Sequence, residues 1–169
     1  MLIRNCISTL ALTGMFFAAN AQFPEWVAAT SACVPDEASA GISAMTDARF
    51  HFLGVNPGVI ETRCNVTNPL DNNANPNWMR LEITQSDPDG MGNVTQVFAQ
   101  LIAVNKFTGV SGVIATYDSN AFNAMPLLKS IPFNFAFNFV NEAYFVRVRL
   151  SRGNGAANPW VARVRLYRD

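Results

Sequence analysis

The chain alternates hydrophobic and polar residues with a period of two over several short segments, which is the pattern of β-strands. The clearest segment spans residues 133–139, where four phenylalanines occupy every second position and would share one apolar face. Residues 144–150 repeat the pattern with tyrosine, valine and leucine. Residues 160–167 do so again, and there the period places Trp160 on the inward face and Val161 on the outward face.

Five weaker segments bring the expected number of strands to about eight. Some alternate, and others are apolar on both faces, which is typical of central strands or of strands that carry a bulge. The alternating segments are residues 49–53, 60–66 and 79–84, and the uniformly apolar segments are residues 94–105 and 110–117. Nearly every break between segments contains Asn, Pro or Gly, which favour turns.

Many short strands separated by turns are typical of a sandwich or a barrel. We therefore predict an all-β protein, an antiparallel β-sandwich of jelly-roll or immunoglobulin-like type. No linker or shift in composition divides the chain, so residues 22–169 are expected to form one domain. Residues 23–34 are interpreted as an edge strand or a strap over the sandwich. Residues 36–44 are interpreted as a short helical turn with acidic residues at its start.

The first 21 residues have the features of a secretory signal peptide. An arginine precedes an apolar run over residues 6–18, and Ala19-Asn20-Ala21 supplies a small-x-small cleavage site. The run is shorter than the ~20 residues that a membrane-spanning helix needs. We predict cleavage before Gln22 and a secreted or periplasmic mature protein without a membrane span.

Export also sets the expectation for the cysteines. Cys6 lies in the signal segment, which leaves Cys33 and Cys64, and two cysteines in an oxidising compartment are expected to form a disulfide. Charged residues make up 14% of the chain, and the formal net charge is +0 at pH 7. This balance does not indicate a nucleic-acid partner, because nucleic-acid-binding domains are strongly basic.

The sequence carries no recognisable catalytic motif. It has a single histidine, His51, and neither a His-Glu-x-x-His nor a Gly-x-Ser-x-Gly pattern. A zinc site needs several converging ligands, and a serine nucleophile needs a base beside it. A glycosidase needs only two suitably spaced carboxylates. A polysaccharide hydrolase therefore stays an alternative, although no pair of acids is singled out, and a non-enzymatic protein is expected.

Four arginines suggest a face that binds anions. If residues 142–151 and 160–168 form a hairpin, these arginines point outward as cross-strand neighbours, where like charges are unfavourable. Either Glu61 and Glu82, which also face outward on predicted strands, neutralise them, or a polyanion such as a sulfated or phosphorylated glycan binds there. The four are Arg147, Arg149, Arg163 and Arg165.

Loops at one end of the sandwich form a second candidate site. Alternate connections of an antiparallel sheet lie at the same end, which would bring together the loops that begin at residues 56, 87, 118 and 152. Calcium binds oxygen ligands of the kind found in these loops, yet Asp-Pro-Asp-Gly at residues 87–90 is also a strong turn sequence without any metal. The candidate ligand- or calcium-binding residues are Asp87, Asp89, Asn93, Asp118 and Asn120.

Together these features favour an extracellular binding or surface module that recognises a glycan or another surface ligand. Phe122, Trp78 and Tyr117 are candidates for stacking on sugar rings, although packing in the core or in a turn is the simpler explanation for each. The alternatives are a structural subunit that self-assembles through edge strands and the polysaccharide hydrolase.

Overall fold

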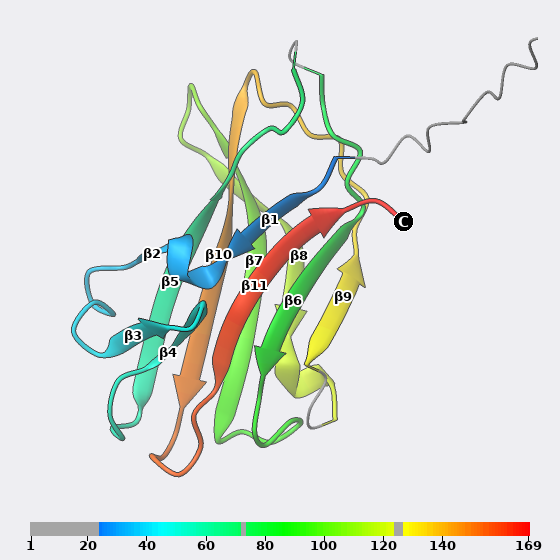
Figure 1. Ribbon diagram of the computed structural model, residues 1–169. Coiled ribbons are helices and arrows are strands. Elements are labelled where there is room, and N and C mark those ends of the chain that lie inside the picture. Colours follow the sequence, from blue (N-terminus) through cyan, green and yellow to red (C-terminus); the bar gives the residue numbers. More distant parts are fainter. Residues whose placement is uncertain (1–23, 72–73, 124–126) are drawn as a thin grey trace, which may run out of the picture.

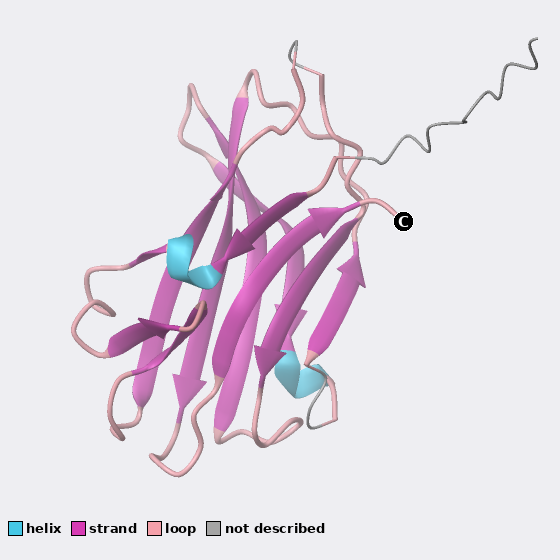
Figure 2. Cartoon of the chain, viewed as in Figure 1, coloured by secondary structure: helices cyan, strands magenta, loops and turns pink. Residues whose placement is uncertain are grey.

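The computed structural model describes residues 24–71, 74–123 and 127–169, so the expected signal peptide and its cleavage site lie outside the described residues. Two antiparallel sheets face one another, with two short 3-10 helices in the connections (Figure 1, Figure 2). This arrangement confirms the predicted antiparallel β-sandwich. The elements are β1 (Trp26–Ala29), η1 (Thr30–Ala32), β2 (Val34–Pro35), β3 (Ser43–Thr46), β4 (Arg49–Phe52), β5 (Gly58–Val66), β6 (Arg80–Ser86), β7 (Thr95–Asn105), β8 (Ser111–Asp118), η2 (Ser119–Ala121), β9 (Leu128–Pro132), β10 (Glu142–Arg152) and β11 (Trp160–Tyr167).

Most strands that follow one another along the chain lie in different sheets, and only β3–β4 and β7–β8 of the described strands stay together. The first sheet has the order β3-β4-β11-β6-β9, and β1 also pairs with β11. The second sheet has the order β2-β5-β10-β7-β8. The β10–β7 ladder runs from Glu142 opposite Asn105 to Arg152 opposite Thr95. β10 is therefore the central strand of the second sheet, and β11 is the central strand of the first.

Nonpolar side chains from both sheets fill the space between them. Alternate residues of each central strand point inward, so Val97 of β7, Val148 of β10 and Val164 of β11 are each 0% exposed. Burial of apolar area stabilises a fold by roughly 25 cal/mol per Å². The largest side chains in this core include Trp78, Tyr117, Phe50, Ile60, Leu81 and Leu101.

The phenylalanine-rich segment closes one end of the sandwich without being a strand. Residues 133–138 have no strand structure, so the strand expected there is wrong. The segment crosses from β9 to β10 over that end (Figure 1). Its rings still pack on the core: Phe137 is 3% exposed, and its ring centroid lies 5.0 Å from that of Trp78. The period of two correctly marked an apolar side, which aromatic packing buries in place of sheet pairing.

The two arginine-bearing strands lie in opposite sheets, so the expected hairpin of residues 142–151 and 160–168 is wrong. β10 pairs with β5 and β7, whereas β11 pairs with β1, β4 and β6. Inside β11, a shift of register between Val161 and Arg163 reverses the expected inward positions at the start of the strand, whereas Val164 and Leu166 beyond the shift are buried as expected. Val161 is fully buried, and Trp160 is half-buried beneath the guanidinium of Arg49, 4.5 Å from the ring centroid.

The N-terminal segment straps the two sheets together, as expected. β1 belongs to the first sheet and β2 to the second, and η1 connects them. Cys33, which follows η1, forms a disulfide with Cys64 of β5, and their Cα atoms lie 4.4 Å apart. The predicted disulfide is therefore confirmed. Residues 37–42 form turns and not a helix, and the Ser39 amide donates to Asp36 Oδ1 at 2.8 Å.

The uniformly apolar segments become neighbours in the second sheet. β7 is an interior strand, and β8 is the edge strand beside it. Their pairing shifts register between Leu101 and Ile102, which is the bulge expected for strands of this composition. Across the described residues, no helix has the length and apolar character needed to cross a membrane.

Candidate functional site

Four connections meet at the end of the sandwich opposite the phenylalanine-rich segment, as the sequence predicted (Figure 1). They join β4 to β5, β6 to β7, β8 to β9, and β10 to β11; we call this region the loop end. Arg152 links two of them, because its guanidinium donates to the carbonyl oxygens of Gly54 and Asn56 at 3.1 and 2.7 Å. Gly155 packs so closely that a Cβ at its position would lie 2.4 Å from the carbonyl oxygen of Val55.

Asp87 is the buried centre of the loop end, at 1% exposure. Its two carboxylate oxygens accept hydrogen bonds from the hydroxyls of Thr95 and Ser119. Asp89 lies beside it and also contacts the Thr95 hydroxyl, while the backbone amides of Val94 and Thr95 donate to Asp89 at 2.8 and 3.0 Å. Hydrogen bonds from two segments, residues 94–95 and Ser119, therefore hold the two acids in place.

The pKa values of the two carboxyl groups are shifted in opposite directions. Burial raises the pKa of Asp87, and it outweighs the hydrogen bonds from Ser119 and Thr95. Burial also acts on Asp89, but hydrogen bonds from Thr95 and from the Val94 amide prevail and lower the pKa of that group. Burial therefore disfavours the charged form of Asp87, whereas the hydrogen bonds to Asp89 favour its charged form.

The other predicted loop-end residues are engaged separately. Asp118 Oδ1 accepts from the Gln96 side chain at 2.9 Å and from the backbone amide of Asn120 at 3.1 Å, and Asn93 is exposed. The described part of the chain contains no group of three or more His, Cys, Asp or Glu residues arranged to hold a metal ion. Hydroxyl and amide donors of the protein already form hydrogen bonds with Asp87, Asp89 and Asp118. Calcium binding at the loop end stays a prediction.

The four predicted arginines do not form one face, because their strands belong to different sheets. On the first sheet, Glu82 lies 2.8 Å from Arg163 and 3.4 Å from Arg165, and Glu25 also pairs with Arg165. Glu82 is 5% exposed, so the two guanidinium groups neutralise a buried carboxylate. Arg163 and Arg165 therefore have a structural role, and the anion-binding face made of all four arginines is excluded.

The remaining two arginines lie on the outward face of the second sheet, together with one that the sequence did not single out. Arg147 of β10 is directly opposite Arg63 of β5 on one side and Gln100 of β7 on the other. Arg149 is opposite Glu61 and Phe98 in the same way. We call this surface the β5–β10–β7 face; it consists of Glu61, Arg63, Phe98, Gln100, Phe145, Arg147 and Arg149.

Positive charge exceeds negative charge on the β5–β10–β7 face. Arg63 is 3.6 Å from Glu61, and its guanidinium lies 5.7 Å from the centroid of the Phe145 ring. Arg147 donates to the side-chain oxygen of Gln100. Arg149 is exposed and forms no ion pair within the described ranges. An open groove lies at the β2 edge of this face. Arg63 lines it together with the carboxylates of Asp36 and Glu37.

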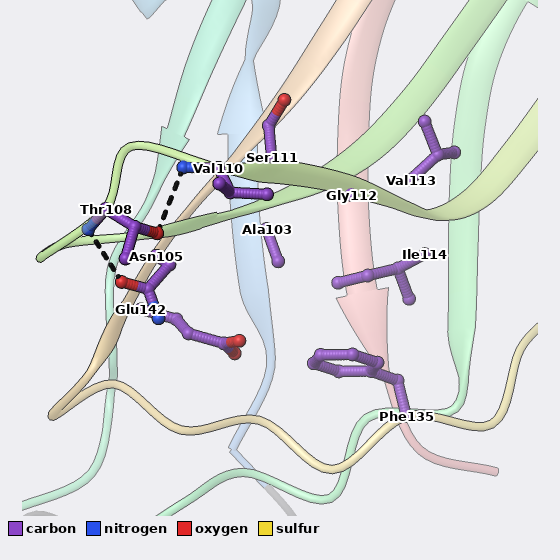
Figure 3. A pocket seen from close by; sticks show the side chains of 10 residues that line it. All are labelled: Ala103, Asn105, Thr108, Val110, Ser111, Gly112, Val113, Ile114, Phe135 and Glu142. Carbon is purple, nitrogen blue, oxygen red and sulfur yellow. Dashed lines mark hydrogen bonds between the residues drawn. The ribbon is translucent and has the colours of Figure 1, made fainter.

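A separate open pocket of about 500 Å³ lies beneath the β7–β8 hairpin (Figure 3). Its walls are mainly apolar side chains of the hairpin, and Phe135 of the phenylalanine-rich segment forms the facing wall. Glu142 at the start of β10 supplies the only carboxylate of the described lining. The lining residues are Ala103, Asn105, Thr108, Val110, Ser111, Gly112, Val113, Ile114, Phe135 and Glu142.

The sequence did not indicate this pocket, because its walls come from three segments whose approach depends on the strand order. The aromatic residues that it did suggest for sugar stacking belong to the interior. Trp78 and Tyr117 are each 1% exposed. Phe122 is half-buried between the Tyr117 ring, 5.8 Å away, and the Lys129 ammonium, 4.1 Å away. Packing, the simpler explanation, holds for all three.

Comparisons with known proteins identify no family. No family model matches the sequence, and no curated protein matches it. The similar solved structures include a mutant family 29 carbohydrate-binding module in complex with cellulohexaose, at 10% identity and a TM-score of 0.31, covering 86% of this chain and 80% of that one.

Two further structures show the same degree of likeness. A family 11 carbohydrate-binding module from Clostridium thermocellum, in complex with a β-1,3-1,4-mixed-linked tetrasaccharide, is 9% identical with a TM-score of 0.38, covering 89% of this chain and 91% of that one. A structure of infectious bursal disease virus, Gx strain, is 14% identical with a TM-score of 0.34, covering 85% of this chain and 30% of that one. Similarity at this level carries no argument about ligand or activity.

Proposed function

We propose that this protein is a non-enzymatic extracellular binding module that holds a glycan on the β5–β10–β7 face. The observation that carries the proposal is the concentration of guanidinium, amide and aromatic side chains on one outward sheet surface. The Cys33–Cys64 disulfide supports a location outside the cytoplasm, where such bonds persist.

The chemistry of the face suits sugar rings. Arg147 and Gln100 present planar donors and an amide to sugar hydroxyls, and Phe145 presents an aromatic ring to the C–H groups of a sugar. Side chains on neighbouring strands stand roughly 4.8 Å apart, and those on one side of a strand stand roughly 6.8 Å apart. A rigid sheet therefore fixes a two-dimensional array of contacts, which an extended saccharide could cross.

A glycan-array screen of the protein, with and without calcium and at low and high salt, tests this proposal. Arg147→Ala and Phe145→Ala should each weaken binding of a selected glycan by about tenfold or more, because interface arginines and aromatic residues contribute most to binding. Arg80→Ala is the matched control, since it removes the same charge from an exposed ion pair with Asp169 on the first sheet. Equal loss in all three variants, or no selective binding at all, would contradict the proposal.

The salt series separates two classes of glycan. Binding that weakens steeply with salt would indicate an acidic or sulfated polymer held by the excess positive charge, and salt-independent binding would indicate a neutral one. Loss of glycan binding in EDTA would instead indicate a binding site at the loop end. The salt series therefore identifies the class of glycan, and the EDTA comparison identifies which of the two regions binds it.

Self-assembly is the second candidate function, and the edge of the second sheet favours it. β8 is an edge strand, and Val113 on it is 54% exposed, with Val110 just before it 69% exposed. An open edge with apolar side chains can pair with another chain. Concentration-dependent sedimentation that Val113→Lys abolishes would support an assembly subunit, and a monomer at high micromolar concentration would count against it.

A further inference from the structure

The pocket beneath the β7–β8 hairpin has the size and lining of a site for a small molecule. Its volume of about 500 Å³ lies within the range of typical ligand pockets. Ala103, Val110 and Ile114 of the hairpin and Phe135 opposite them give it apolar walls (Figure 3). No lysine, arginine or histidine is among the described residues that line it.

A fixed carboxylate is the only charged group in this lining. The Tyr144 hydroxyl donates to Oε2 of Glu142 and accepts from the backbone amide of Asn138 at 2.7 Å. Tyr144 is 3% exposed, and burial raises its pKa, so the phenol stays protonated and keeps donating to the carboxylate. Figure 3 shows the carboxylate directed into the space between the hairpin and Phe135.

One oxygen of this carboxylate is left without a protein donor. Within residues 24–71, 74–123 and 127–169, Oε1 of Glu142 accepts no hydrogen bond, and Glu142 forms no ion pair. The backbone amide of Lys106 donates to the carbonyl oxygen of Asn141, next to Glu142, but its ammonium is committed to the carbonyl oxygen of Phe139 at 2.7 Å. A half-buried anion with a free acceptor oxygen therefore faces an apolar space that contains no cation.

We propose that this pocket binds a small organic cation, an amine or ammonium compound whose apolar body lies against the hairpin and whose charged head pairs with Glu142. A carboxylate is only an acceptor, so its complement must donate, and a charged donor makes the stronger hydrogen bond. The Phe135 ring gives the same head an aromatic face. An anionic molecule of equal size would be repelled, and a neutral one would form only the weaker hydrogen bond.

This site is independent of the proposed glycan site. Ala103 of β7 lines the pocket on the inward side of the second sheet, whereas Phe98 and Gln100 of the same strand point outward. Failure of glycan binding would leave the pocket and its carboxylate unchanged, and failure of cation binding would leave the outward face unchanged.

Titration calorimetry with three probes that share one ring tests the proposal: phenethylammonium, 2-phenylethanol and phenylacetate. The ammonium should bind about tenfold or more tightly than the alcohol, because a charge-assisted hydrogen bond replaces a neutral one, and phenylacetate should not bind. Glu142→Gln should reduce ammonium affinity to that of the alcohol. The amide oxygen in that variant can still accept from Tyr144, so the fold should be preserved.

Glu37→Gln is the matched control, because it removes one carboxylate from an exposed position outside this pocket. It should leave the affinity for phenethylammonium unchanged. Equal binding of the three probes, binding that survives Glu142→Gln, or no binding of the ammonium at millimolar concentration would each overturn the proposal.

Discussion

Substituting Asp87 by Asn and by Ala should have very different effects on stability, although both substitutions remove the same titratable carboxyl group. The alanine variant leaves the Ser119 hydroxyl buried without its acceptor, while Thr95 keeps Asp89 as a partner. A buried polar group that loses its partner destabilises the native state by about 1–3 kcal/mol. Asp87→Ala should therefore lower the free energy of unfolding by at least this amount.

The asparagine variant retains an acceptor oxygen for Ser119 and gains an amide that can donate to Thr95 or Asp89. It also removes the repulsion between two carboxyl groups that share one threonine hydroxyl. We expect its free energy of unfolding at pH 7 to stay within about 1 kcal/mol of the native value. Urea denaturation followed by tryptophan fluorescence measures both variants under the same conditions.

The pH dependence supplies the sharper comparison. The native pKa of Asp87 is raised, so its contribution to stability is fully present below the unfolded value of about 3.9 and is lost as pH rises through the folded pKa. Asp87→Asn removes this titration, and the stability of the variant relative to the native protein should increase as pH rises from about 4. Asp89, with a lowered pKa, acts in the opposite sense in both proteins and stabilises above its unfolded value.

Two results would refute this reasoning. One is an asparagine variant as unstable as the alanine variant at pH 7, which would mean that the charge itself holds the loop end together. The other is a difference between native and asparagine proteins that does not change between pH 4 and pH 7. In either case burial would not be the main influence on the Asp87 carboxyl, contrary to the direction of its pKa shift.

Three further predictions concern the disulfide, the loop packing and the metal. Cys33→Ala with Cys64→Ala should lower the free energy of unfolding by about 3–4 kcal/mol, because the disulfide closes a loop of 31 residues in the unfolded chain; a loss below about 1 kcal/mol in chemical denaturation would contradict this. Gly155→Ala should destabilise by about 1–3 kcal/mol, since its Cβ would lie 2.4 Å from the Val55 carbonyl oxygen, whereas Gly41→Ala, with nothing within 4 Å, should cost less than about 1 kcal/mol in the same assay. Millimolar calcium should raise the melting temperature, and EDTA should reverse the rise, if the loop end binds calcium; an unchanged melting temperature removes that hypothesis.

The sequence alone was sufficient for the features that depend on local pattern. The period of two in residues 144–150 predicted which side chains of β10 are buried, and the two cysteines that remain after the expected signal peptide predicted the Cys33–Cys64 disulfide. Counting alternate connections placed the loops around Asp87 and Asp118 at one end. These inferences succeed because strand pleat and chain reversal impose the same geometry whatever the strand order.

Features that depend on which strands become neighbours came only from the tertiary structure. Residues 153–159 carry the chain from one sheet to the other, so Arg147 and Arg163 lie on different surfaces although their strands are consecutive. The shift of register at Val161 and the packing of residues 133–138 on Trp78 likewise involve segments that are distant in sequence. The β5–β10–β7 face and the pocket at Glu142 each combine segments distant in sequence. Alternation along one strand records which face is buried but contains no information about the strand beside it, and for that reason long-range pairing decided where the candidate sites lie.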